Sequence, residues 1–181
     1  MRIICVLALA LAAQGVPLRA TTIVPADLGE LSRDAVAIAR GRVVDVRSQW
    51  TEDRGTVETI VTLAVESYLK GGLGATVRFK VPGGELGRYR TVIVGAPDFA
   101  VDQRVVVFLG AHGPTVPYIV GFNQGVFRVI RSQDDSGWVV APPPNVAGPT
   151  TVRIVRGDPG RRAVPLADFE QQVRALAGAA R

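Results

Sequence analysis

Hydrophobic and polar residues alternate along much of the chain with the period of two that is typical of β-strands. The clearest example is residues 57–66, where Val, Thr, Val, Leu and Val occupy every second position. Residues 76–81 alternate in the same way, and the glycine-rich stretch 70–74 separates the two runs. The pattern therefore predicts a hairpin of two strands, each with one face in the core.

Other apolar runs predict further strands. The expected positions are residues 36–46, 104–109, 118–122, 125–130, 138–140 and 152–155. Gly41 lies inside the first run and indicates a β-bulge or a close approach of two backbones. The polar residues 48–55 are expected to form the turn after this strand. Residues 104–109 are almost entirely apolar, which predicts a strand covered on both faces, and Asp-Asp-Ser-Gly at 134–137 is typical of a hairpin turn.

Two segments near the ends of the chain carry helical spacing instead. Asp27 is a favoured N-cap, and the apolar residues after it recur three and four positions apart, which predicts a short helix ending near Asp34. A second stripe predicts an amphipathic C-terminal helix that begins near Pro165 and lies against the sheet. That stripe consists of Leu166, Phe169, Val173 and Leu176. Since no helix separates the strands, the predicted fold class is mainly β, a small antiparallel barrel or sandwich with these two helices.

The start of the chain has the pattern of a secretory signal peptide. A positive charge at Arg2 is followed by the apolar run 3–13 and then by small residues leading to Ala20. We expect cleavage after Ala20 and export to the periplasm or the medium. Ala13 is an alternative site, because Leu18 is large for its position before the cleavage point. The apolar run is shorter than the roughly 20 residues that cross a bilayer, so no transmembrane helix is expected in the mature chain.

Cleavage would also change the composition of the chain. Residues 1–20 contain two of the 21 basic residues and none of the 16 acidic ones, so the formal charge falls from +5 to +3. They also contain Cys5, the only cysteine, so the mature chain is expected to form neither a disulfide nor a thiolate site. A small, scattered positive charge argues against a nucleic-acid partner. The remaining residues 21–181 have the length of a single domain.

The residue types that carry most enzymatic chemistry are scarce. His112 is the only histidine and lies in a predicted turn, so we expect no metal site, no cofactor and no Ser-His-Asp triad. The glycine-rich stretches lack the residues that complete a phosphate-binding loop. Paired carboxylates are the remaining catalytic alternative, because two acids across a cleft can act as acid and base. The candidates are Glu58, Glu66, Glu85 and Asp98.

The longest predicted loop, residues 83–99, is the candidate binding region. Within it, Arg88, Tyr89 and Arg90 place an aromatic ring between two cations, a combination suited to gripping an acidic partner or stacking on a base. Phe99 closes the loop before an apolar strand. These are the predicted partner-binding residues, and no catalytic residue is assigned.

Four stretches of the chain carry a resemblance to a known family. They are Ala-Arg-Gly-Arg-Val-Val at 39–44, Tyr-Leu-Lys-Gly at 68–71, and the runs at 76–81 and 103–109. Over residues 35–110 their order resembles the netrin-like domain family, which includes the tissue inhibitors of metalloproteinases. The resemblance implies a secreted five-stranded barrel of the oligonucleotide/oligosaccharide-binding (OB) type, with helices packed beside it.

The chain departs from that family at its amino terminus. The inhibitors use a Cys-x-Cys start that approaches the protease metal, whereas the mature chain would begin Thr21-Thr22-Ile23. The inhibitory residues are therefore not carried over. The chain also looks similar to uncharacterised exported bacterial proteins that share Pro-Gly-Gly at 82–84 and Gly-x-Pro-x-Phe at 95–99. That similarity implies export but no particular activity.

These features predict an exported binding or protein-interaction module without catalytic activity. Its partner is expected to be an exported protein or a component of the cell envelope. Two alternatives stay open from the sequence. One is a carboxylate-dependent hydrolase that acts on cell-envelope polymers, and the other is a structural subunit of the envelope with an exposed apolar patch.

Overall fold

The computed structural model describes residues 26–113, 115–132, 137–141, 143 and 162–179. Three predicted features lie outside the described residues, namely the signal peptide with its cleavage site, most of the turn at 134–137 and the strand at 152–155. None of the described helices is both long and apolar enough to cross a membrane.

Strands make up most of the regular structure, with a helix near each end of the described chain. In chain order the elements are α2 (Leu28–Asp34), β1 (Ala37–Trp50), β2 (Val57–Lys70), β3 (Thr76–Pro82), β4 (Gly84–Leu86), β5 (Tyr89–Thr91), β6 (Arg104–Gly110), β7 (Tyr118–Ile119), the 3-10 helix η1 (Phe122–Gly125), β8 (Val126–Arg131), β9 (Trp138–Ala141), β10 (Val164–Pro165) and α3 (Leu166–Ala179). The prediction of a mainly β fold with a short N-terminal helix and a C-terminal helix is confirmed. Helix α3 begins directly after Pro165, as predicted.

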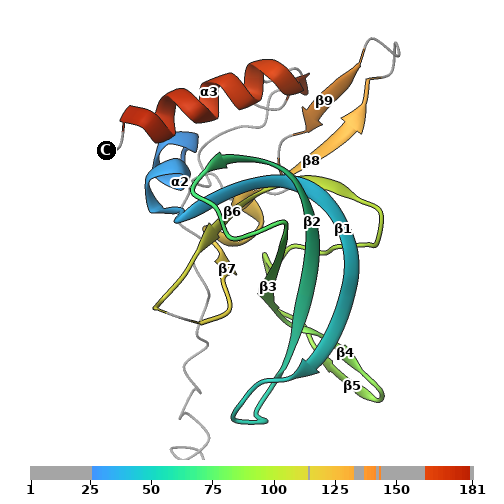
Figure 1. Ribbon diagram of the computed structural model, residues 1–181. Coiled ribbons are helices and arrows are strands. Elements are labelled where there is room, and N and C mark those ends of the chain that lie inside the picture. The colour runs from blue at the N-terminus through green and yellow to red at the C-terminus, as the bar shows by residue number, and fades with distance from the viewer. Residues whose placement is uncertain (1–25, 114, 133–136, 142, 144–161, 180–181) are drawn as a thin grey trace, which may run out of the picture.

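A ring-like, barrel-like sheet forms the body of the molecule (Figure 1). The long strand β1 pairs antiparallel with β2 on one side and with β6 on the other. Strand β3 pairs with β2, and the short strand β7 bridges β3 and β6, so the ring runs β1-β2-β3-β7-β6 and returns to β1. The parallel β3–β7 junction consists of the pair Lys80↔Tyr118. Beyond β6 the sheet continues through β8, β9 and β10.

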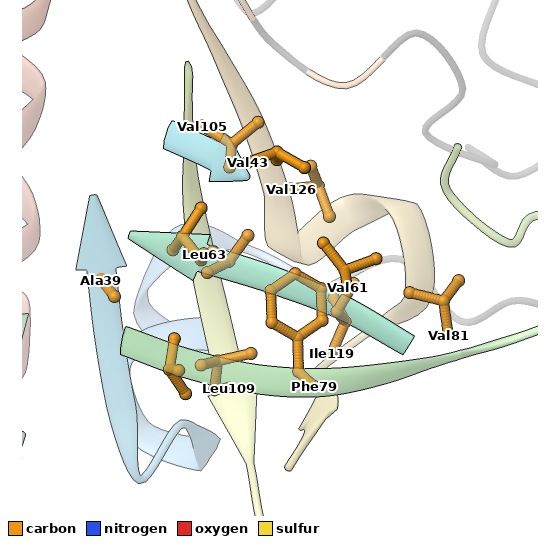
Figure 2. Packing of buried hydrophobic residues seen from close by; sticks show 12 residues of the cluster. Ala39, Val43, Val61, Leu63, Phe79, Val81, Val105, Leu109, Ile119 and Val126 are labelled. Carbon is orange, nitrogen blue, oxygen red and sulfur yellow. The ribbon is translucent and has the colours of Figure 1, made fainter. Parts of the chain in front are cut away.

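The inside of the ring holds the first of two hydrophobic cores (Figure 2). Its buried residues are Ala39, Val43, Val61, Leu63, Val77, Phe79, Val81, Val105, Val107, Leu109, Ile119 and Val126. Alternate residues of β2 and β3 supply much of it, as their period of two predicts. Phe79 is the largest side chain in this core and is fully buried.

The second core lies between the outer face of the sheet and the two helices, which pack against each other beside the ring (Figure 1). Its buried residues are Leu31, Ala35, Ile38, Leu69, Val106, Phe108, Val129, Val140, Phe169, Val173 and Ala177. Strand β6 supplies both cores, with Val105 and Val107 in the first and Val106 and Phe108 in the second. The prediction that this strand is covered on both faces is thereby confirmed.

Helix α2 begins with the cap that the sequence predicts. The Asp27 carboxylate accepts a hydrogen bond from the Glu30 N–H at 2.8 Å, and the Glu30 carboxylate accepts one from the Asp27 N–H at 2.9 Å. This reciprocal pair is a capping box, and an N-cap of this kind contributes about 1 kcal/mol. The N–H of Ala26 donates to Oε1 of Gln124 at 2.8 Å and ties the start of the helix to η1.

The predicted irregularity at Gly41 is confirmed. The register between β1 and β2 shifts between Arg40 and Gly41. A Cβ atom at this position would collide with the carbonyl oxygen of Ala64 and would lie 2.9 Å from Cγ of Leu63. Because glycine has no Cβ, Gly41 allows the backbones of β1 and β2 to approach this closely at the bulge.

The predicted turn after β1 is placed too early. The strand continues through the first three residues of that turn and ends at Trp50, because side chains there pair with those of β2. Gln49 donates a hydrogen bond to Glu58 at 3.0 Å, and the Ser48 and Thr59 hydroxyl oxygens lie 3.4 Å apart. These cross-strand polar pairs stabilise a strand that lacks apolar alternation.

The predicted strand at 118–122 is too long. Strand β7 ends at Ile119, and the chain leaves the sheet because Gly121 and Phe122 both have left-handed backbones, with φ of 67° and 56°. The 3-10 helix η1 follows. At the far edge of the sheet, β10 pairs with β9 in a position that the sequence pattern did not indicate.

We predict that Gly41→Ala destabilises the fold by about 1–3 kcal/mol, the usual cost of overpacking a filled site. The added methyl group would have to displace the backbone of Ala64, which is held in the β1–β2 pairing. Gly72→Ala is the matched control, because no heavy atom lies within 4 Å of a Cβ placed there. Urea denaturation measures both variants, and equal midpoints would contradict this account of the bulge.

Candidate functional site

The segment predicted as an irregular loop, residues 83–99, contains a small hairpin. Strands β4 and β5 pair antiparallel, with Leu86 opposite Tyr89 at the turn end. Gly87 has a φ of 59°, the positive value that a two-residue hairpin turn of this kind requires. The expectation of a loop without regular structure is therefore wrong for its first half, whereas the part after β5 has no strand before β6.

Hydroxyl groups fasten this hairpin to the β1–β2 hairpin. The Thr59 hydroxyl donates to the carbonyl oxygen of Gly83 at 2.7 Å, and the Thr91 hydroxyl accepts from the Val57 N–H at 3.1 Å. A Cβ atom at Gly84 would lie 2.5 Å from Oγ1 of Thr59, so the approach of the two hairpins depends on a glycine here. In Figure 1 β4 and β5 accordingly lie near the β1–β2 turn.

An apolar hollow lies between the end of β3, the β1–β2 turn and β7. We call it the first hollow, and it has a volume of about 390 Å³. Its wall is mostly apolar and includes Val57, Pro82, Ile93, Pro97, Tyr118 and Phe122. Lys80 and Glu58 add one charge of each sign. A hollow of this size, with an apolar wall and a few polar groups, is typical of ligand-binding sites.

A second, more polar hollow of about 450 Å³ adjoins the first. Five residues line both hollows, namely Pro82, Gly83, Thr91, Ile93 and Pro97. The segment that carries these residues therefore forms the wall between the two hollows. Four of the five, all but Pro82, belong to residues 83–99, the region that the sequence predicts to bind a partner.

Two exposed aromatic rings belong to residues that adjoin the hollows in the chain, since Trp50 precedes Thr51 of the first hollow and Tyr89 precedes Arg90 of the second. Trp50, at the end of β1, packs edge to face against Tyr89, with ring centroids 5.0 Å apart. The Arg88 guanidinium lies over the Tyr89 ring at 5.1 Å, and its Nη2 donates to the Tyr89 hydroxyl at 3.0 Å. We call these three residues the aromatic tip. Trp50 and Tyr89 are 37% and 46% exposed, so a partner can reach both rings.

The four residues predicted to bind a partner fall into three places. Arg88 and Tyr89 belong to the aromatic tip, whereas Arg90 lines the second hollow. Phe99 also lines the second hollow, but it is half-buried and its ring packs edge to face on that of Phe79 at 5.4 Å. Phe99 therefore helps to cover the core of the ring as well as facing the hollow.

Sequence reasoning missed three residues of this region, Trp50, Ile93 and Phe122. Trp50 had a usable signal, because a tryptophan in an otherwise polar stretch has little apolar sequence around it to bury it. Ile93 lies in an ordinary apolar run. Phe122 lines the first hollow at a point where the backbone turns with a positive φ. Neither of these two carries a sequence signal that separates it from a core residue.

The carboxylates considered as acid–base pairs are spread over the molecule. Glu58 lines the first hollow, where its Oε1 accepts a hydrogen bond from Gln49. Glu66 is held by two arginine side chains on the outer face of the sheet, at 3.4 and 3.2 Å. Glu85 and Asp98 both line the second hollow, which makes them the two candidates that share one cleft.

His112 lies in the turn between β6 and β7, as predicted, and its ring stacks on that of Tyr118 with centroids 4.9 Å apart. Among the described residues, no group of three or more His, Cys, Asp or Glu side chains is arranged to hold a metal ion. The arrangement around the hollows thus consists of apolar walls, hydroxyls and separate charges.

Comparison with known proteins identifies no relative of this chain, so the site is interpreted from its geometry alone. No protein-family model, no curated protein and no solved structure matches the chain. The resemblance to the netrin-like family and to exported bacterial proteins therefore stays a prediction from the residues that carry it.

The turn between β1 and β2 borders the first hollow through Thr51 and Thr56. The Thr51 hydroxyl donates to Oδ1 of Asp53 at 2.5 Å, and the Gly55 N–H donates to the same oxygen at 3.0 Å. These two hydrogen bonds, the one from Thr51 first, hold the pKa of Asp53 below its ordinary value of 3.8. The carboxylate thus fixes the shape of the turn while it is ionised.

We predict that NMR titration finds the pKa of Asp53 below 3.8 and that Thr51→Val raises it, because valine keeps the shape of threonine but cannot donate. A lowered pKa stabilises the turn at neutral pH, and this contribution is lost as the pH falls through the pKa. Thr56→Val is the control, since its hydroxyl does not contact Asp53. An unchanged pKa in Thr51→Val would refute the assignment.

Proposed function

We propose that this protein is an exported binding or protein-interaction module that engages its partner through the first hollow and the aromatic tip. The partner is an exported protein or a component of the cell envelope. The observation that carries the proposal is a hollow with an apolar wall, bordered by exposed apolar and aromatic side chains.

The order of the strands supports this choice of surface. The ring uses five strands, β1, β2, β3, β6 and β7, which is the strand number of an OB barrel. Such barrels bind ligands over their second and third strands and at the loops between strands 1 and 2 and between strands 4 and 5. The first hollow lies in the corresponding region, between the β1–β2 turn, the end of β3 and the start of β7.

The exposure of apolar side chains supports it as well. Val92 and Val94 flank Ile93 and are 70% and 78% exposed, the highest values among the large hydrophobic residues of the described chain. Phe122 is 36% exposed. Of these residues, Phe122 lines the first hollow and Val92 the second. Exposed apolar side chains beside a hollow are typical of interaction surfaces, and full burial of such a side chain contributes about 1.5–3 kcal/mol.

The composition of the aromatic tip fits a protein partner. Tryptophan, tyrosine and arginine are the residues that most often dominate the binding energy of protein interfaces. The Tyr89 ring already contacts both the Trp50 ring and the Arg88 guanidinium, so less side-chain entropy remains to be lost on binding. The tip therefore offers a preformed anchor that adjoins both hollows in the chain.

We predict that Ile93→Asp reduces binding about tenfold or more, because it puts a charge into the wall of the first hollow. The purified protein is used as bait on the exported and envelope fractions, and captured proteins are quantified by mass spectrometry. Ile130→Asp is the matched control, since Ile130 is 47% exposed but lines neither the first nor the second hollow.

The proposal requires a partner that is retained by the parent protein and by Ile130→Asp and is lost with Ile93→Asp. Equal capture by all three proteins would contradict it. A reproducible hydrolase activity on envelope polymers, abolished by Glu85→Gln or Asp98→Asn, would replace it with the carboxylate-dependent alternative.

A further inference from the structure

The second half of β1 lacks a neighbouring strand on one of its sides. Strand β1 pairs with β2 almost to its end, but its pairing with β6 covers only residues 37–42. Beyond them, Val43 exchanges backbone hydrogen bonds of 2.8 Å with Asp102 and Gln103. The strand then continues past the start of β6 toward β4 and β5 (Figure 1). In the described chain no other strand pairs with this side of residues 46–50, which we call the open edge.

The backbone groups of alternate residues point outward along the open edge. The Thr51 N–H donates to the carbonyl oxygen of Thr56 at 2.9 Å, so the backbone of Thr51 faces the β2 side. In an antiparallel pair, successive residues point their N–H and C=O groups to opposite sides of the strand. The backbones of Val46, Ser48 and Trp50 therefore face away from β2, and no register shift interrupts the pairing here. Among the described residues, none of these N–H and C=O groups has a hydrogen-bond partner.

The open edge lacks two features that usually keep an unpaired strand from joining another chain. These features are proline and charged side chains that point inward. Residues 46–50 contain no proline, and Arg47 is their only charged residue. Val46 packs against the core inside the ring, so Arg47 points to the opposite face by alternation, and it pairs there with Asp45 at 3.0 Å. The open edge is therefore free to accept another strand.

The second hollow lies along the open edge. Val46 and Ser48 line this hollow from β1, and Glu85 and Arg90 line it from the β4–β5 hairpin. Because side chains alternate between the two faces of a sheet, every second side chain of an added strand would point to the face on which the hollow lies. The edge offers main-chain hydrogen bonds and the hollow offers side-chain contacts. This combination is the one by which sheet edges recognise extended peptides.

We propose that the open edge binds an extended segment of a partner protein, which pairs with β1 as an added strand and places alternate side chains in the second hollow. This inference rests on the proposed function for the nature of the partner, and it adds the form in which the partner binds. Trp50 ends the open edge and also belongs to the aromatic tip, so the two features form one continuous surface.

A segment of another protein suits this surface better than a second copy of the chain. If two open edges paired with each other, the inner-face side chains of each copy would have to fill the hollow of the other. Those side chains are already engaged within their own copy. Val46 packs against the inner core, and the Ser48 hydroxyl accepts from the Glu85 N–H at 3.3 Å. Trp50 packs on Tyr89. Two copies would thus leave both second hollows unfilled.

Random dodecapeptides displayed on phage are probes that do not depend on the natural partner. Peptides are selected on the purified parent protein, and the most enriched one is synthesised. Ser48→Pro removes an N–H that makes no hydrogen bond to β2, and proline is tolerated at such edge positions. We expect this variant to bind the peptide about tenfold more weakly or worse. Ser48→Ala is the matched control, because it loses the same hydroxyl but keeps the N–H, and circular dichroism checks both folds.

Amide hydrogen exchange followed by NMR locates the peptide residue by residue. Bound peptide should slow exchange at Val46, Ser48 and Trp50 about tenfold or more, because their outward N–H groups gain acceptors. Exchange at Arg47 and Gln49 should stay unchanged, since their N–H groups face β2. A contact made by side chains alone would not produce this alternation.

The proposal is overturned if no selected peptide slows these three amides, or if Ser48→Pro binds as tightly as Ser48→Ala. Slower exchange confined to residues 118–122 would refute the open edge while supporting the first hollow. Slow edge amides without peptide, slowing further as the protein concentration rises, would show a second copy at the edge and would also refute the proposal. None of these measurements uses the captured partner, so this inference and the proposed function fail separately.

Discussion

The pairing of β1 with strands on both of its sides is the constraint on which the rest of the structure depends. Because β1 joins β2 along its length and β6 over its first half, the sheet closes on itself and encloses the core around Phe79. Gly41 allows the close backbone contact at the bulge between β1 and β2. The same closure turns the outer side of β6 toward the helices, which bury a second core there.

Closure is least complete where β3 meets β7, and the proposed binding surface lies there. Among the described residues, Lys80↔Tyr118 is the one strand pair between β3 and β7, and the Lys80 N–H donates to the carbonyl oxygen of Pro117 at 2.8 Å beside it. The first hollow is lined from both sides of this junction, and the segment after β5 supplies the rest of its wall. The incomplete closure of the ring thus accounts for the position of this apolar hollow.

Much of the fold could be predicted from the sequence. Burial of one face of a strand makes apolar and polar residues alternate, and the N-cap of a helix requires particular residue types. The strands around Val61 and Phe79, the cap at Asp27 and the bulge at Gly41 follow from such local rules. The end of β1 at Trp50 could not be predicted from the sequence, since polar side chains near that end pair with β2 and do not alternate with apolar ones. The hollows depend on contacts between distant segments, so the sequence indicated the 83–99 region but not Ile93 or Phe122 as its lining.

The central claim is that partner binding occurs where the ring closes least completely, at the first hollow and the aromatic tip. Amide hydrogen exchange of the protein, measured with and without its captured partner, tests this claim most directly. The account predicts slower exchange on binding in residues 89–97 and 118–123, with the β8–β9 hairpin and α3 unchanged. Slower exchange confined to α3 or to the β8–β9 hairpin would contradict it.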